Sequence, residues 1–224
     1  MHMSLKNRNL WIKPLCIAAI SLICTPFSAP AHALDLIKSL APEAPYIAIA
    51  ENSQEEQALS FIASVTDEGL SFLSDTSLSE NQKQKQFARF LNKNFDLKAI
   101  GRFALGRYWR TATPQQQREY TQLFKTMLID VYSSRFSEYS GQSVTVIKSQ
   151  ARGKNDVIVN SKITGDNGPE IKLDWRVRNK NGRLKIIDVM VEGVSMAVTQ
   201  RSDFASVIQR GGGDINVLLA HLEQ

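Results

Sequence analysis

The spacing of apolar residues changes once along this chain, near residues 139–142, and that change restricts the folds open to it. Before this point apolar residues recur every three or four positions, as in amphipathic helices; after it they alternate with polar residues, as in strands. Four alternating runs follow with short turns between them, at 143–150, 155–164, 170–177 and 183–191. Short connections join antiparallel neighbours, so these runs predict a four-stranded antiparallel meander. Helices, then a meander, then more helices predict the α+β class.

Cap residues mark where the predicted helices begin. Ser79 and Thr113 each begin the sequence pattern of a capping box, which satisfies the free N–H groups of a first helical turn. The predicted helices cover 55–73, a segment from Ser79, a short segment capped by Asp96, a long segment from Thr113 through Tyr139, a segment capped by Ser202 that ends at Gly211, and 214–222. Gly101 and Gly106, in and near the end of the short helix, predict close backbone packing there.

Apolar side chains gather on three surfaces of the predicted domain. The long helix carries an aromatic-rich stripe of Tyr120, Leu123, Phe124, Met127, Leu128, Val131, Tyr132, Phe136 and Tyr139. The third strand places Ile171, Leu173, Trp175 and Val177 on one face and charged residues on the other. An apolar elbow of Val194, Met196 and Val198 follows Gly193. Facing apolar surfaces can form an ordinary core or line a ligand cavity, and periodicity alone leaves both interpretations open.

The first 33 residues have the three parts of a secretory signal peptide. Three cations precede an apolar run at 15–24, and Ala31 and Ala33 suit the small-residue cleavage site. The apolar run is shorter than the roughly 20 residues that span a bilayer. We therefore expect cleavage after Ala33, a poorly ordered lead-in over 34–54 and a single domain over 55–224. Because the mature part has no cysteine, an exported chain of this kind favours the bacterial periplasm.

The mature part has few residues suited to catalysis. His221 is its single histidine, so Ser-His-Asp and Cys-His arrangements are close to excluded. The spacings of a zinc site and of a phosphate-binding loop are missing as well. Without the signal peptide 24 basic and 22 acidic residues remain, a balance that gives little support to nucleic-acid binding. We predict a protein that is not an enzyme and that uses no metal, cofactor or nucleic acid.

Carboxylates are the remaining candidates for acid–base chemistry of the kind that glycosidases use. They are Asp174, Asp188, Glu192 and Asp203. We expect most of them to be solvated strand residues or helix caps. Asp188 differs because it lies among apolar residues and is expected to be partly buried. It would either belong to an active site or orient a loop through backbone hydrogen bonds, and the sequence leaves both roles open.

Two segments of the chain resemble the MlaC-like, or toluene-tolerance, family of periplasmic phospholipid-binding proteins. They are "ALGRYWRTATPQQQREYTQLFKTML" at 104–128 and "IDVMVEGVSMAVTQRSDFASVIQRGG" at 187–212. The run at 105–117 and the "EGVSM" run at 192–196 carry most of the specificity, and the resemblance extends over residues 55–222. It implies helices packed around one face of the sheet and a deep apolar lipid cavity between them.

The family resemblance also implies a function and a set of site residues. The residues expected at the lipid are Tyr108, Trp109, Phe124, Met127, Leu128, Val131, Tyr132, Ile171, Leu173, Trp175, Met190, Val194, Met196, Phe204 and Ile208. The protein would shuttle phospholipid between an outer-membrane lipoprotein complex and an inner-membrane ABC transporter complex, and so maintain outer-membrane lipid asymmetry. A monomer is expected from this role. Arg102, Arg107 and Arg110 would attract a phosphate head group or an acidic docking surface, or are simply solvated.

Three alternatives remain open from the sequence. The first is a carrier associated with hopanoids, since some relatives have that association and apolar walls distinguish lipid tails poorly. The second is an envelope interaction protein with a filled core and no bound lipid. The third is an enzyme on a cone-like α+β fold, which would need a cluster of carboxylates with perturbed pKa values around Asp188.

Overall fold

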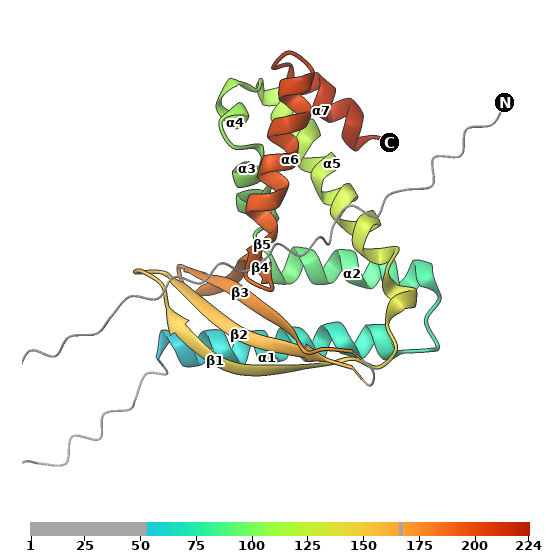
Figure 1. Cartoon of the computed structure of the whole chain (residues 1–224), viewed down its shortest axis with the longest axis vertical. Helices are drawn as coiled ribbons and strands as arrows, with labels where there is room; N and C mark the ends of the chain where they lie inside the picture. Colours follow the sequence, from blue (N-terminus) through green and yellow to red (C-terminus); the bar gives the residue numbers. More distant parts are fainter. Residues whose placement is uncertain (1–52, 166–167) are drawn as a thin grey trace, which may run out of the picture. The chain divides into compact units, whose positions relative to one another are not determined.

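The computed structural model describes residues 53–165 and 168–224. The predicted signal peptide and all but the last two residues of the predicted lead-in lie outside the described residues. The elements are α1 (Gln54–Ser74), α2 (Glu80–Asn94), α3 (Leu97–Leu105), α4 (Tyr108–Thr111), α5 (Pro114–Ser133), the 3-10 turn η1 (Phe136–Glu138), β1 (Ser143–Ala151), β2 (Asp156–Thr164), β3 (Ile171–Lys180), β4 (Arg183–Val191), β5 (Val194–Ser195), α6 (Met196–Arg210) and α7 (Ile215–Leu222). In Figure 1, α1 runs along the sheet, and α3 to α7 stand together on the side of β4 and β5.

Three helix starts predicted from cap residues, at Ser79, Asp96 and Thr113, are confirmed. The Ser79 hydroxyl accepts the N–H of Gln82 at 3.3 Å, and the Gln82 side chain accepts the N–H of Ser79 at 2.8 Å. Thr113 and Gln116 form the same reciprocal pair at the start of α5. Asp96 caps α3 as predicted. Each cap satisfies donors that the first helical turn leaves free.

The long helix α5 is shorter than predicted, because it ends at Ser133 and does not continue to Tyr139. Ser133 and Ser134 donate their hydroxyl groups back to carbonyl oxygens of the preceding turn. Serine competes in this way with the backbone hydrogen bonds that would extend a helix. The chain then leaves the helix axis and forms the 3-10 turn η1. The ring centroid of Phe136, in this turn, lies 5.3 Å from that of Phe87 in α2.

Within the described part of the chain the sheet has five strands in the order β1-β2-β3-β4-β5, and the predicted number of four was wrong. All neighbouring strands are antiparallel, as the short turns predicted. The fifth strand forms because Glu192 and Gly193 take φ angles of 51° and 78°, which turn the chain back so that Val194 pairs with Val191. A two-residue turn of this kind needs left-handed backbone at both central positions, and glycine adopts that conformation at little cost.

Helix α6 begins at Met196, earlier than predicted, and Ser202 is not its cap. The cap is Ser195, whose Oγ accepts the N–H of Val198 at 3.1 Å. Ser202 and Asp203 resemble a helix start in the sequence, but Met196 and Val198 of the apolar elbow already lie in the first turn of the helix. The predicted end of α6 at Gly211 is confirmed, and so is the short last helix.

Buried apolar side chains of the described residues form two separate clusters. The sheet cluster joins α1 to one face of β2, β3 and β4 through Ala58, Ile62, Val65, Val157, Val159, Leu173, Trp175, Val177 and Ile186. The helical cluster joins α3 to α7 through Ala104, Leu105, Tyr108, Ala112, Tyr120, Phe124, Phe204, Ile208, Ile215, Leu218 and Leu219. Leu173, Trp175 and Val177 of the predicted apolar face of β3 are buried in this cluster, whereas Ile171 is 38% exposed and lies outside it.

Glycines let the helices of the helical cluster approach closely. A side-chain carbon at Gly101 would lie 3.0 Å from the Phe124 ring, which is tighter than ordinary van der Waals contact. One at Gly211 would lie 2.5 Å from Val217, so the return of α7 onto α6 requires a residue without a side chain. The close packing predicted at Gly101 is therefore confirmed.

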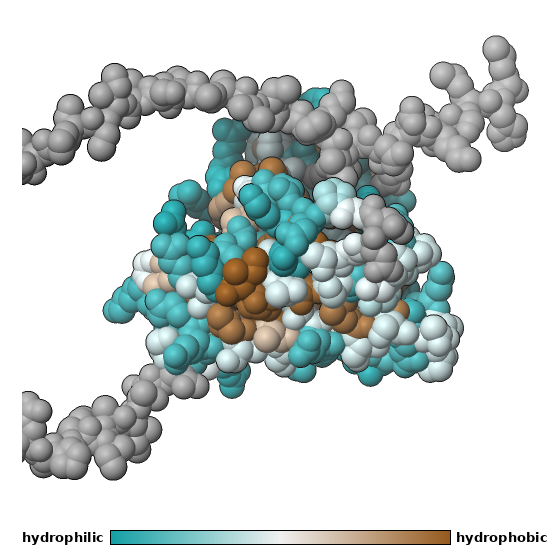
Figure 2. Space-filling model, turned by 60° about the horizontal axis from the view of Figure 1, so that its bottom comes forward, coloured by the Kyte–Doolittle hydropathy of each residue, from teal (hydrophilic) through white to brown (hydrophobic). Residues whose placement is uncertain are grey.

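The surface combines hydrophilic residues with local apolar patches. Figure 2 shows a face on which apolar residues gather near the middle, with hydrophilic residues around them. Among the helices between residues 53 and 224, with 166–167 left aside, none is both long and apolar enough to cross a membrane.

Candidate functional site

The apolar stripe of α5 is buried at one end of the helix and open at the other. Tyr120 and Phe124 are 0% and 2% exposed, whereas Val131 is 43% exposed. Phe124 and Val131 are about two helical turns apart and therefore lie on the same face. Met127 and Leu128, between them, are partly buried against the helical cluster. One continuous helix face thus passes from closed core to open apolar surface.

The direction of α5 explains why its stripe is uncovered. At the middle of α5, the Phe124 ring packs on the Phe204 ring of α6 with their centroids 6.2 Å apart. Toward its end α5 diverges from α6 and approaches α2 (Figure 1). There Gln84 of α2 donates to a carboxylate oxygen of Asp130 at 3.0 Å. Helices α3 and α7, together with Phe204 of α6, therefore cover the first half of the stripe, and Val131 in the second half stays open.

Tyr132 combines open surface with a desolvated hydroxyl group. Its side chain is exposed, yet burial of the phenol among protein atoms raises its pKa, an effect that the nearby charge of Arg135 opposes. We call Met127, Leu128, Val131 and Tyr132 the uncovered stripe.

A group of phenylalanine rings lies where α5 meets α2. Phe87 and Phe90 stack with their centroids 6.2 Å apart, Phe136 contacts Phe87 edge-on, and Phe95 contacts Phe90 at 6.1 Å. These four rings are only partly buried. Sequence reasoning did not assign them to a site. Phe87 and Phe90, three residues apart on an otherwise polar helix, were the available signal, whereas the position of Phe136 depends on the early end of α5.

Asp188 fixes the elbow that connects β4 to α6. One of its carboxylate oxygens accepts the Ser195 hydroxyl at 2.6 Å, and the other accepts the N–H of Ala197 at 3.1 Å. The Ser195 hydroxyl oxygen in turn caps α6, so the turn and the helix start form one hydrogen-bonded unit. Of the two roles that the sequence left open for Asp188, these bonds assign it the orientation of a loop.

The apolar side chains of the elbow differ in exposure. Val194 lies just after the turn and is 54% exposed, whereas Met196 at the start of α6 is half-buried. Met190 of β4 pairs with Ser195 and is also half-buried. The elbow therefore adds apolar surface next to β4 and α6 without belonging to either buried cluster.

The structure divides the predicted lipid-binding residues among several environments. Tyr108, Phe124, Phe204 and Ile208 are buried in the helical cluster, with Trp109, Met127 and Leu128 packed against it. Leu173 and Trp175 are buried in the sheet cluster, where the Trp175 indole N–H donates to the Ser161 hydroxyl at 3.0 Å. Ile171 lies apart, at a hollow of about 420 Å³ that Ile163 also lines. Val131, Tyr132 and Val194 are exposed, and Met190 and Met196 are half-buried.

The candidate carboxylates have mainly structural contacts. Asp174 accepts a hydrogen bond from Asn160 at 2.7 Å, and Glu192 accepts one from the N–H of Lys172 at 2.5 Å. Asp203 differs: one of its oxygens is buried without a hydrogen-bond partner among the described residues, and desolvation raises its pKa. Within 53–165 and 168–224, no three His, Cys, Asp or Glu side chains gather as a metal site requires.

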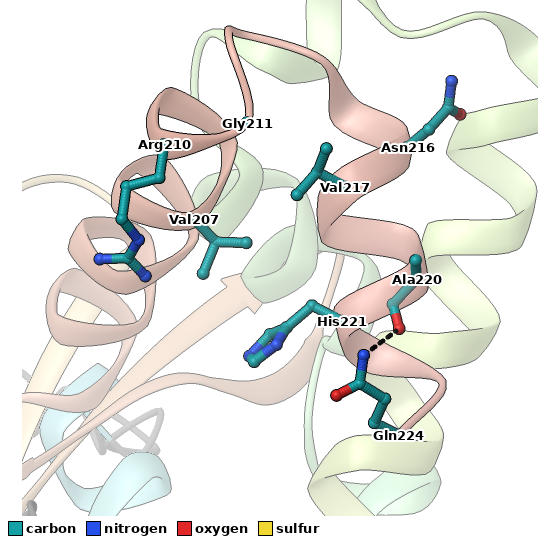
Figure 3. Close-up of a pocket in the computed structure, with 8 residues that line it drawn as sticks. All are labelled: Val207, Arg210, Gly211, Asn216, Val217, Ala220, His221 and Gln224. Atoms are coloured by element: carbon teal, nitrogen blue, oxygen red, sulfur yellow. Dashed lines mark hydrogen bonds between the residues drawn. The ribbon is translucent and has the colours of Figure 1, made fainter.

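A separate hollow of about 570 Å³ lies between α6 and α7 (Figure 3). Val207 and Val217 face one another across it, and Arg210 and His221 extend along its edge. None of the lipid-binding residues predicted from the sequence lines this hollow. It is therefore a second apolar surface, distinct from the uncovered stripe.

Comparison with known sequences relates the chain to lipid-binding proteins. Residues 63–224 match the MlaC protein family. The toluene tolerance protein ttg2D of Pseudomonas putida is 32% identical over 110 residues, which cover 49% of this chain and 51% of that protein. The intermembrane phospholipid transport system binding protein MlaC of Haemophilus influenzae is 24% identical over 133 residues, which cover 58% of this chain and 61% of that protein. The matches thus span between about half and three fifths of the length of these curated relatives.

A solved structure is similar over most of the described chain. It is a phospholipid-binding protein from Ralstonia solanacearum in complex with a phospholipid, with a TM-score of 0.65 and 26% identity. The similarity covers 74% of this chain and 94% of that one. The family match begins inside α1 and includes every later helix and strand. The chain therefore belongs to the MlaC protein family.

Proposed function

We propose that this protein binds a phospholipid by its acyl chains along the uncovered stripe of α5 and the elbow, and carries it between membranes. The exposure of Val131 is the central observation, because this residue shares a helix face with the buried Tyr120 and Phe124. Apolar side chains left open on the face of a core helix indicate a surface that a ligand covers. The phospholipid bound to the similar Ralstonia solanacearum protein supports the same ligand class for this chain.

The physical chemistry of acyl chains suits a carrier of this kind. Each methylene group removed from water contributes about 0.8 kcal/mol, so a two-chain lipid stays bound as long as water is the alternative. Transfer from the protein to a bilayer changes the free energy little, because both surroundings are apolar. The protein would thus protect the lipid in water, and the direction of transport would come from the partners that it meets.

We further propose that the protein works in the periplasm, after cleavage of the signal peptide behind Ala33, as a monomer. It would exchange phospholipid with an inner-membrane ABC transporter complex and an outer-membrane lipoprotein complex, and so maintain outer-membrane lipid asymmetry. The family membership and the intermembrane transport named for the Haemophilus influenzae relative support this role. The structural hydrogen bonds of Asp174, Asp188 and Glu192 support a carrier over an enzyme.

The first test is the lipid content of the protein itself. Residues 34–224 are purified from the periplasm and studied by native mass spectrometry, followed by lipid extraction. We expect a stoichiometric phospholipid. A bound hopanoid would contradict the phospholipid assignment and support a hopanoid carrier. An unliganded mass that stays unchanged after incubation with phospholipid vesicles would contradict lipid carriage altogether.

A matched pair of variants locates the lipid. Val131→Asp places a charge on the uncovered stripe, and Val217→Asp places one in the hollow between α6 and α7; the two valines are 43% and 39% exposed. Because both side chains are accessible, both variants should fold, which circular dichroism verifies. We expect Val131→Asp to lose the co-purified lipid and Val217→Asp to keep it. The opposite result would place the lipid between α6 and α7.

A further inference from the structure

The segment from residue 97 to residue 118 has a strongly one-sided charge. It contains Lys98, Arg102, Arg107, Arg110 and Arg118 and no acidic residue. The segment forms α3, α4 and the start of α5, and its first four cations are exposed. None of these five side chains forms an ion pair with a carboxylate of the described residues. The segment thus carries five cations that form no ion pair within the described residues, and Asp96 and Glu119 are the acidic residues at its two ends.

Aromatic rings hold the guanidinium groups of this region in place. The guanidinium carbon of Arg107 lies 4.9 Å from the centre of the Tyr108 ring, and Arg107 also donates a hydrogen bond to the Tyr108 hydroxyl at 2.9 Å. Arg102 lies over the ring of Trp109 at 5.9 Å. Such contacts orient a guanidinium group while its charge stays available to another partner. Two of the five cations, Arg102 and Arg107, are therefore oriented by neighbouring rings and not by a carboxylate.

Helix α6 adds apolar side chains and a further cation to this region. Helices α3 and α6 pack side by side, and Arg201 of α6 lies over the Phe103 ring of α3 at 5.1 Å. Val198, one turn before Arg201, is 55% exposed, and Phe103 is exposed as well. A side-chain carbon at Gly106 would lie 3.0 Å from the Arg201 guanidinium, so the side chain fits against the α3–α4 turn. We define the α3–α6 surface by Phe103, Val198, Arg102, Arg107 and Arg201.

The scaffold beneath this surface is firmly hydrogen-bonded. Asp188 binds both Ser195 and Ala197 at the start of α6, and the Ser195 hydroxyl accepts the N–H of Val198. These hydrogen bonds hold the first turn of α6 in place, and Val198 is therefore exposed as a result of the fold. Exposed apolar side chains on a rigid part of the fold can insert into a soft partner that rearranges around them.

We infer that the α3–α6 surface docks onto the anionic head-group layer of a lipid bilayer. Arginines near such a surface are attracted to its negative charge, and exposed apolar and aromatic side chains enter the boundary between head groups and acyl chains. An acidic protein would match the charges but would leave Phe103 and Val198 in need of a fitted apolar pocket. The inference goes beyond the proposed lipid carriage, because it concerns what the outside of the protein touches.

Vesicle flotation tests the inference directly. Purified protein is mixed with vesicles of phosphatidylcholine that contain phosphatidylglycerol, and in parallel with vesicles of phosphatidylcholine alone. We expect the protein to float with the anionic vesicles at low salt and to be released as salt screens the charges. We expect weak binding to the neutral vesicles at any salt concentration.

Single substitutions then map the contact. Arg102→Gln and Arg107→Gln should each weaken binding to anionic vesicles roughly fivefold, and Val198→Ser about tenfold. Arg89→Gln on α2 and Ile147→Ser on β1 are matched controls, because both residues are exposed and lie outside the α3–α6 surface. The controls should bind like the wild-type protein, and thermal melting verifies that every variant is folded.

Several results would overturn the inference. They are equal binding to both vesicle types, binding that salt does not affect, and losses in the controls as large as those in the α3–α6 variants. Binding to an acidic polypeptide but to neither vesicle would also overturn it and would assign the surface to a protein partner. Lipid content separates this inference from the proposed function. A lipid-loaded protein that does not float contradicts the docking alone, and a floating protein that never holds lipid contradicts the carriage alone.

Discussion

The sheet cluster and the uncovered stripe are built from similar residues but differ in what lies opposite them. In the sheet cluster α1 covers the apolar face, so that Val157, Val159 and Val177 are almost completely buried. On α5 an equally apolar face loses its cover halfway along, and Val131 stays open. The period and composition of an apolar face therefore do not decide whether it becomes core. The element that packs against it decides.

This difference has an energetic consequence. Full burial of a valine side chain contributes about 1.5 kcal/mol or more, and the uncovered stripe forgoes part of that contribution in the free protein. The fold tolerates the loss because the two closed clusters supply the stability. A ligand that covers the stripe would gain the free energy of burying this apolar surface. This gain is the physical basis of the proposed lipid binding.

The largest effect on stability is expected from Phe124→Ala, which sharpens the contrast between the two ends of α5. The Phe124 ring is buried against Tyr120, Phe204 and the backbone of Gly101. Its removal leaves a cavity and should lower the free energy of unfolding by about 3–5 kcal/mol. Val131→Ala on the same face should cost less than about 1 kcal/mol. Chemical denaturation measures both, and equal losses would contradict the difference between the ends.

A smaller effect is expected from Asp156→Asn at the edge of the sheet cluster. Asp156 is buried and binds Arg178 and Arg176, and the hydrogen bonds from Arg178 are the main reason why its pKa is lowered. The substitution should lower the free energy of unfolding by about 1–3 kcal/mol at neutral pH. We expect a value near the lower end of this range because both arginines are partly exposed.

The pH dependence gives this prediction a sign. Because the pKa of Asp156 is lower in the folded state than in the unfolded state, its contribution is complete above the unfolded pKa and is lost as the pH falls through the folded pKa. The stabilities of the wild-type and Asp156→Asn proteins should therefore converge in acid. A difference that stays constant from neutral to acidic pH would contradict the role of the ion pair.

A comparable or smaller loss is expected from Asp188→Asn, which tests whether the elbow is held rigid. Asparagine keeps one acceptor oxygen and cannot accept both the Ser195 hydroxyl and the Ala197 N–H as the carboxylate does. We expect about 1–2 kcal/mol of lost stability and faster hydrogen exchange at the start of α6. Asp174→Asn, a carboxylate with a single side-chain partner, serves as the control. Unchanged exchange in the Asp188 variant would show that the elbow does not depend on it.

The smallest effect on stability is expected from Val194→Glu, with a large effect on lipid. Val194 is already exposed, so the fold should lose less than about 0.5 kcal/mol. If the elbow borders the lipid, the bound acyl chains would bury the introduced carboxylate, and lipid retention in the purified protein should be abolished. Ile147→Glu on β1, which is similarly exposed, should retain the lipid. Lipid retained by Val194→Glu would remove the elbow from the proposed site.

Local signals in the sequence predicted much of the fold. Capping residues such as Ser79, Asp96 and Thr113 determine helix starts through bonds within one turn, so their prediction was confirmed. The early end of α5 and the added strand β5 were not predicted. The first depends on a serine pair that competes with the helix, and the second on left-handed backbone at Glu192.

The candidate site was only partly accessible from the sequence. The pattern located the stripe of α5 and the elbow, because both are continuous in the chain. It grouped Trp175 with them, although Trp175 is buried in the sheet cluster, away from both. Which helix covers a given sheet face depends on tertiary packing between segments more than 100 residues apart, such as Ile62 and Trp175. Sequence periodicity carries no information about that choice.

The central claim is that acyl chains contact the uncovered stripe, and photocrosslinking tests it most directly. The purified protein is loaded with a phospholipid that carries a photoreactive group on an acyl chain, irradiated, digested and analysed by mass spectrometry. We predict adducts on the peptides that contain residues 127–132 and 190–196. Adducts confined to the peptides around Val207 and Val217, or to the sheet cluster, would contradict the account.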